Sequence, residues 1–97
     1  GPPYMIYYVY LIVSVKNNKL ISYVGYTNNI KKRLDLHNTS KGAKFTKGRV
    51  WKLAYLEKFG SKNLALKREY KLKKDYTLRN KIKKKFIKNE NSSTSSL

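Results

Sequence analysis

The stretch Tyr7-Tyr8-Val9-Tyr10-Leu11-Ile12, and the stretch Tyr23-Val24-Gly25-Tyr26-Thr27 that follows it, decide the fold of this chain. Both are rich in the aromatic and β-branched residues that favour strands. Between them, Lys16-Asn17-Asn18-Lys19 is typical of a tight turn. The sequence therefore predicts a β-hairpin with strands at residues 6–15 and 20–26.

The position of the turn determines which residues of the hairpin face each other. A turn centred in the middle of the polar segment places Tyr10 opposite Gly25 and Ile12 opposite Tyr23. Tyr10 and Tyr23 then lie on one face of the sheet as diagonal neighbours. Gly25 leaves room above the sheet, where a phosphate or a backbone could approach. The alternative is a tyrosine-rich strand pair whose rings simply pack in the core.

The remaining chain alternates helix and strand signals. Thr27 or Asn28 can cap a first helix, and Ser61 can cap a second. The predicted elements are a helix over 29–37, a polar loop over 38–50, a strand over 51–59, and helices over 62–74 and 77–88. The order ββαβαα predicts an α+β domain, with a small three-stranded antiparallel sheet flanked by helices.

A single domain is predicted over residues 5–88. Residues 1–4 are expected to be a tag remnant, and the polar run 89–97 has the composition of a disordered tail. The chain has no cysteine, which excludes disulfides and Cys-based zinc sites and is compatible with a cytoplasmic or nucleoid-associated location. No apolar run approaches the roughly 18 residues that a membrane helix needs. No helix pairs a broad apolar face with cations in a way that the core would not already use, so no membrane partner is expected.

The charge of the chain points to a polyanionic partner. Twenty-three Lys and Arg residues oppose five Asp and Glu residues, for a formal net charge of +18. Such a field attracts polyanions, and phosphate binding gains free energy from counterion release. Nucleic acid is the favoured partner, and an anionic membrane surface is the second. AT-rich coding would explain why Lys outnumbers Arg, but it would not remove the acidic residues.

Two side chains of the first helix are candidates for phosphate chemistry. Arg33 and His37 are four residues apart, so both point from one helical face. Arginine can bind a phosphate oxygen bidentately, and histidine can relay protons near neutral pH. Ile30 and Leu34 form the neighbouring apolar stripe, which predicts that the two side chains lie near its border rather than deep inside. A packed or exposed histidine and a solvated arginine are the alternatives.

Glu69 is an acidic residue on the apolar stripe of an otherwise cationic helix. It shares that stripe with Ala65 and Leu72. A hard divalent cation such as Mg²⁺ would explain the carboxylate, because Mg²⁺ is often held by one or two carboxylates while keeping several waters. An ion pair with a neighbouring Lys or Arg explains it equally well.

The loop over 38–50 carries cations interleaved with glycine, a hydroxyl and an aromatic ring. This pattern suits phosphate contact and base stacking. Trp51 is expected to anchor the loop to the core. The candidate nucleic-acid contacts are Lys41, Lys44, Thr46, Lys47 and Arg49. The lysines of the last helix either extend this track or form a solvated face: Lys81, Lys83, Lys84, Lys85 and Lys88.

Together these motifs resemble the GIY-YIG nuclease family. Tyr8-Val9-Tyr10 and Tyr23-Val24-Gly25 stand where its two tripeptides would be, and Arg33, His37 and Glu69 follow at compatible spacing. The sequence is most similar to the small bacterial YhbQ-like branch, which is related to the Slx structure-specific endonuclease. Tyr8 replaces the first glycine, and valine replaces isoleucine in both tripeptides. Neither change removes a chemical group.

The resemblance implies a GIY-YIG-type fold and a role for each of five residues. Tyr10 would be the general base, with its pKa lowered by a metal ion, by Arg33 and by the positive field. Tyr23 would orient the attacking water or the scissile phosphate. Arg33 would stabilise charge on the phosphoryl oxygens, His37 would assist proton transfer, and Glu69 would hold one Mg²⁺ or Mn²⁺ ion.

The function implied is that of a metal-dependent DNA endonuclease. The expected substrates are branched, flap or single-stranded DNA, cut without long-site sequence specificity, in repair or recombination. A partner protein could supply the targeting. The alternative is a non-catalytic module that binds DNA or structured RNA.

Overall fold

A computed structural model describes residues 5–95, with the side chains of residues 5–91. The tag remnant expected over 1–4 and the end of the chain at 96–97 lie outside the described residues. The elements are β1 (Tyr7–Lys16), β2 (Lys19–Thr27), α1 (Ile30–Asn38), a short 3₁₀ turn η1 (Lys44–Thr46), β3 (Lys52–Phe59), α2 (Lys62–Lys74) and α3 (Tyr76–Ser95). The predicted α+β fold and the order ββαβαα are confirmed.

The three strands form one antiparallel sheet in the order β2-β1-β3. Tyr10 pairs with Gly25 and Ile12 with Tyr23, as the hairpin register predicts. Asn17 and Asn18 form the turn, with positive φ values of 55° and 62°. Asparagine tolerates this backbone region, and a two-residue turn of this hand matches the twist of the strands. The hairpin leaves β2 at an edge of the sheet.

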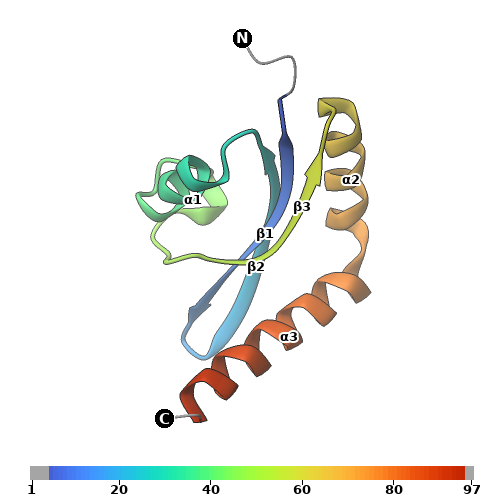
Figure 1. The fold of residues 1–97 in the computed structure, drawn as a ribbon. Helices are drawn as coiled ribbons and strands as arrows, with labels where there is room; N and C mark the ends of the chain where they lie inside the picture. The colour runs from blue at the N-terminus through green and yellow to red at the C-terminus, as the bar shows by residue number, and fades with distance from the viewer. Residues whose placement is uncertain (1–4, 96–97) are drawn as a thin grey trace.

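Each face of the sheet is covered by different helices (Figure 1). α1 lies on one side, and α2 and α3 lie on the other. The α2 and α3 side holds the larger apolar cluster, made of Val9, Leu11, Val13, Val24, Ala65, Leu72 and Ile82. The α1 side holds Tyr10, Ile12 and Trp51, with Ile30 and Leu34 of α1 packed against them. Because side chains alternate along a strand, β1 supplies both clusters.

Two predicted boundaries are wrong. The cap of α1 is Asn29, whose side chain accepts a hydrogen bond from the Lys32 backbone, rather than Thr27 or Asn28. The disordered tail predicted from Asn89 is instead helical as far as Ser95. Composition alone suggested disorder there, but Ile82 and Phe86 pack α3 against the core, and further along the helix Glu90 lies 3.4 Å from Lys52 of β3.

Candidate active site

Tyr10 lies at the centre of β1, and only 2% of its surface is exposed. Its ring lies over Gly25 of the neighbouring strand: a Cβ atom at Gly25 would stand 2.4 Å from the Tyr10 hydroxyl oxygen. The space that glycine leaves above the sheet is therefore filled by the tyrosine itself. The prediction that a phosphate or backbone would enter that space is wrong.

His37 lies in the last turn of α1 and is buried, with 1% of its surface exposed. Its Nε2 lies 2.8 Å from the Tyr10 hydroxyl, and its Nδ1 lies 2.9 Å from Thr46 Oγ1. The prediction of a position at the border of the apolar stripe is wrong, because the loop after α1 folds back over the ring. At Gly42 that loop lies so close that a Cβ atom would stand 2.4 Å from His37 Nδ1.

The hydrogen bonds of Thr46 determine which nitrogen of His37 carries the proton. The Thr46 hydroxyl donates to the Ala43 carbonyl oxygen at 2.9 Å, so its single hydrogen is used there. It can then only accept from His37, which places a hydrogen on Nδ1 and leaves a lone pair on Nε2. Tyr10 therefore donates to Nε2. The result is a buried chain that runs from Tyr10 through His37 and Thr46 to a backbone carbonyl.

Thr46 is fully buried, which contradicts the prediction that it contacts nucleic acid. It orients His37 instead. Trp51 anchors this loop as predicted, since its indole Nε1 donates to the Thr46 carbonyl at 2.9 Å. Asn38 holds the other end of the loop, through 2.6 Å and 3.1 Å hydrogen bonds with the Trp51 backbone. Sequence patterns did not single out Asn38, because its partner lies across the loop.

The other loop cations lie where a polyanion could reach them. Lys41, Lys44 and Lys47 are exposed, and Arg49 is partly buried. Within the described part of the chain, Arg49 Nη1 is buried and has no hydrogen-bond partner. A phosphate in solution cannot reach this buried nitrogen, so the three exposed lysines are the better candidates for contact with a polyanion.

Burial sets the protonation states at the centre of the site. It raises the pKa of Tyr10 well above its usual value, and the nearby Tyr23 raises that pKa further; Arg33 lowers it and Glu69 raises it. Burial, together with Arg33, lowers the pKa of His37. The expected lowering of the Tyr10 pKa is therefore wrong for the protein without metal. At neutral pH the pair is a neutral phenol beside a neutral imidazole.

The same interactions show which predicted catalytic residues lie together. Tyr10 is bonded to His37, and Tyr23, Arg33 and Glu69 lie near enough to act on its charge. They come from both sides of the sheet, since α1 and α2 cover opposite faces. β2, which lies between these two sides, is an edge strand of the sheet.

Tyr23 connects the buried pair to the surface. Its ring lies edge-on to His37, with centroids 5.2 Å apart. Phe45 of η1 stacks on Tyr23 at 6.1 Å with an interplanar angle of 23°, and 58% of the Phe45 surface is exposed. An aromatic column therefore runs from solvent to the Tyr10–His37 hydrogen bond.

Glu69 projects from α2 between the buried residues Ala65 and Leu72. Its carboxylate lies 3.7 Å from Lys73 Nζ, and its side chain is 17% exposed. This geometry is compatible with both interpretations of the residue, because Lys73 is half exposed and can move away. Among the described residues there is no group of three or more potential metal-ligating His, Cys, Asp or Glu side chains. A single carboxylate still fits a hydrated Mg²⁺ ion, which needs few protein ligands.

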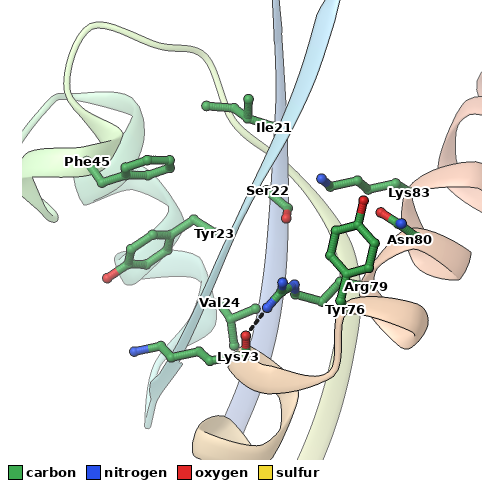
Figure 2. Close-up of a pocket in the computed structure, with 10 residues that line it drawn as sticks. All are labelled: Ile21, Ser22, Tyr23, Val24, Phe45, Lys73, Tyr76, Arg79, Asn80 and Lys83. Carbon is green, nitrogen blue, oxygen red and sulfur yellow. Dashed lines mark hydrogen bonds between the residues drawn. The ribbon is translucent and has the colours of Figure 1, made fainter.

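A pocket of about 570 Å³ opens beside this centre, along the β2 edge (Figure 2). Tyr23 and Phe45 line one side of it. Lys73, the partner of Glu69, reaches into it from the end of α2. The pocket thus shares Tyr23 and Phe45 with the aromatic column, and it borders the candidate metal ligand Glu69 through Lys73.

Comparison with known proteins identifies the family to which this chain is similar. The family model for the GIY-YIG catalytic domain matches residues 6–91. A UPF0213 protein of Staphylococcus haemolyticus is 50% identical over 68 residues, covering 69% of this chain and 79% of that protein. One from Clostridium perfringens is 46% identical over 89 residues, covering 87% and 90%.

A solved relative is the UPF0213 protein BH0048 of Bacillus halodurans, determined by solution NMR. It is 35% identical to this chain, the match covers 79% of this chain and 80% of that protein, and the two structures superpose with a TM-score of 0.44.

None of the helices within residues 5–95 has the length and apolar character that a bilayer-spanning segment requires.

Proposed function

The chain belongs to the GIY-YIG family of nucleases, and we propose that it is a divalent-metal-dependent endonuclease that hydrolyses phosphodiester bonds in DNA. The observation that carries this proposal is the buried Tyr10–His37–Thr46 chain with Arg33 and Glu69 beside it. An apolar core alone would not require a histidine held in one tautomer against a tyrosine hydroxyl. General-base catalysis does require a proton acceptor that is held in a fixed orientation and protonation state beside the group that it deprotonates.

In the proposed reaction, the attacking water gives its proton to the Tyr10 oxygen while the Tyr10 proton passes to His37 Nε2. The water O–H bond breaks as the new O–P bond forms, and the P–O bond to the leaving 3′ oxygen breaks. No free tyrosinate is needed, which agrees with the raised pKa of Tyr10. His37 is then the final proton acceptor: the new N–H of the imidazolium is on Nε2 and faces Tyr10, while Thr46 goes on accepting from Nδ1–H.

Three further residues complete the proposed site. Arg33 stabilises the negative charge that develops on the phosphoryl oxygens. Tyr23, which leads from the surface to His37, orients the phosphate or the water. Glu69 would hold one Mg²⁺ or Mn²⁺ ion, whose positive charge stabilises the leaving oxygen. Lys73 would then release the carboxylate.

We further propose that the substrate is branched, flap or single-stranded DNA, cut without long-site sequence specificity. The site is a shallow edge of a small domain, and bases must be unpaired to stack on the exposed Phe45 ring. A partner protein would supply any targeting, in repair or recombination. The competing proposal is a non-catalytic module that binds DNA or structured RNA.

A cleavage assay tests these proposals together. End-labelled single-stranded, duplex, flap and four-way-junction DNA, with a structured RNA, are each incubated with Mg²⁺, Mn²⁺ or EDTA. The Glu69→Gln protein is run beside the natural sequence as an isosteric control. Metal-dependent products that disappear in the variant are expected. Nucleic acid that is retarded but intact in every lane would establish the binding module instead.

A further inference from the structure

The pocket beside the active site extends beyond the catalytic residues onto α3. There it is lined by Tyr76, Arg79, Asn80 and Lys83. These positions are three and four residues apart, so they share one face of the helix. Figure 2 shows them across β2 from Phe45 and Tyr23. We call these four residues the α3 wall.

Arg79 is fixed within the α3 wall by the end of the preceding helix. Its Nη1 donates to the carbonyl oxygens of Leu72, at 3.4 Å, and of Lys73. Cations are favoured at a helix C-terminus, where carbonyls lack partners. A guanidinium carries five N–H donors, so these two hydrogen bonds leave Nε and Nη2 for an anion. Pre-positioning of this kind lowers the entropy cost of binding a phosphate.

The cations of the α3 wall differ from the other lysines of the helix. Lys83 is partly buried at the pocket, whereas Lys81 and Lys84 are exposed and line none of the pockets described in residues 5–95. If only the general positive field mattered, all these lysines would be equivalent. The structure therefore distinguishes two sets of α3 lysines: Lys83 lines the pocket, and Lys81 and Lys84 lie on the solvated face of the helix.

Aromatic rings border the cations on both sides. Phe45 is 58% exposed at one end of the pocket, and Tyr76 is 67% exposed at the other. Grooves that combine cations for the backbone with exposed rings for the bases are typical of sites for single nucleic-acid strands. A duplex presents its bases stacked and paired, and would leave both rings without a partner.

From this arrangement we infer that the α3 wall binds an unpaired stretch of the DNA strand on one side of the scissile phosphate. The strand passes from the catalytic residues, across the β2 edge, to Arg79 and Lys83. This inference rests on the proposed function for the identity of its ligand. It adds the path that the strand takes, and it makes α3 part of the substrate site.

The experiment measures binding of a fluorescein-labelled single-stranded oligodeoxynucleotide in EDTA, where no cutting interferes. Lys83→Gln and the double variant Arg79→Gln/Lys83→Gln are compared with Lys81→Gln and Lys81→Gln/Lys84→Gln, which remove the same charge from the solvated face. A variant that binds one phosphate fewer should have a slope of log Kd against log salt that is smaller by about 0.7. We expect that decrease for Lys83→Gln and about twice that decrease for the double variant, with a several-fold weaker affinity in each, and a smaller change for the controls.

Equal decreases in affinity in the two pairs of variants, or no decrease in either, would overturn the inference. Arg79 also contacts the end of α2, so Lys83→Gln alone decides the matter if the double variant unfolds by circular dichroism. The cleavage assay separates this inference from the proposed function. If the natural sequence cuts no DNA but its affinity depends selectively on the α3 wall, the nuclease proposal fails and the binding path stands.

Discussion

The two faces of β1 show opposite ways of using a buried residue. Val9, Leu11 and Val13 point toward α2 and α3 and pack in an apolar cluster. Tyr10, on the other face, is equally buried but carries a hydroxyl that is committed to His37. One face stabilises the fold by removing apolar surface from water. The other accepts buried polar groups, which cost free energy unless every partner is present.

This difference predicts that damage on the two faces will have different consequences. On the apolar face, a substitution should lower stability but leave the activity of each folded molecule intact. On the polar face, a substitution should reduce activity by far more than stability. The following predictions test this separation, from the largest expected effect to the smallest.

Tyr10→Phe should have the largest effect on activity. It removes the hydroxyl that joins the attacking water to His37, and general acid–base catalysis of this kind contributes about 10²- to 10⁴-fold. Leaving His37 Nε2 without its donor should cost only about 1–3 kcal/mol of stability. Single-turnover cleavage and urea denaturation measure the two quantities. If the variant cuts DNA at the natural rate, Tyr10 is not the base.

Leu11→Ala is the matched change on the apolar face. Leu11 is fully buried, and a Leu to Ala change in a core costs about 2–5 kcal/mol. At a temperature where the variant is still folded, its cleavage rate should lie within a few-fold of the natural protein. A rate decrease as large as that of Tyr10→Phe would show that the two faces are not separable.

Thr46→Val should have an intermediate effect, because it removes the acceptor that holds the Nδ1 hydrogen of His37. The other tautomer then competes, and we expect cleavage to slow by about tenfold or more, equivalent to about 1.4 kcal/mol. Thr46→Ser retains the hydroxyl and serves as the control. Should Thr46→Ser slow cleavage while Thr46→Val does not, the methyl group rather than the hydroxyl would be what matters at this position.

The pH profile should show the smallest but most diagnostic effect. Burial and Arg33 lower the pKa of His37, so the acid limb of cleavage should have its midpoint below the ordinary histidine value of 6.5. The unfolded chain binds the proton more readily, so the contribution of His37 to stability is complete above 6.5 and is lost as the pH falls through the folded value. Rates and unfolding free energies measured from about pH 5 to 8 test both statements. A midpoint above the ordinary histidine value would contradict them.

Much of the sheet could be predicted from the sequence, since its determinants are local. The alternation of side chains and the two-asparagine turn place Tyr10 opposite Gly25 without reference to the rest of the chain. The helix caps were less certain, and Asn29 rather than its neighbours caps α1. The length of α3 was missed, because the polar composition after residue 88 predicted disorder whereas the helix continues to Ser95.

Motif spacing identified Tyr10, Tyr23, Arg33, His37 and Glu69 as candidates, and their catalytic roles stay predictions. The structure bonds Tyr10 to His37 and places Tyr23, Arg33 and Glu69 near enough to act on the charge of Tyr10, but the environment of the site was not predicted. The buried positions of His37 and Thr46 were missed, because they depend on how the loop over 38–50 folds back onto α1. Gly42 is one of the glycines of that loop, and only its close approach to the His37 ring gives the reason for a glycine there.

The sequence by itself determined the hairpin, its register, the positive charge and the identity of the reactive side chains. These follow from residue type and from spacings of two, three or four along one element. Only the tertiary structure decided which of those side chains are desolvated and which hydrogen bonds fix their protons. Desolvation depends on segments distant in the sequence, and it reverses the expected direction of the Tyr10 pKa. The chemistry of the site therefore depends on contacts between segments that no local pattern encodes.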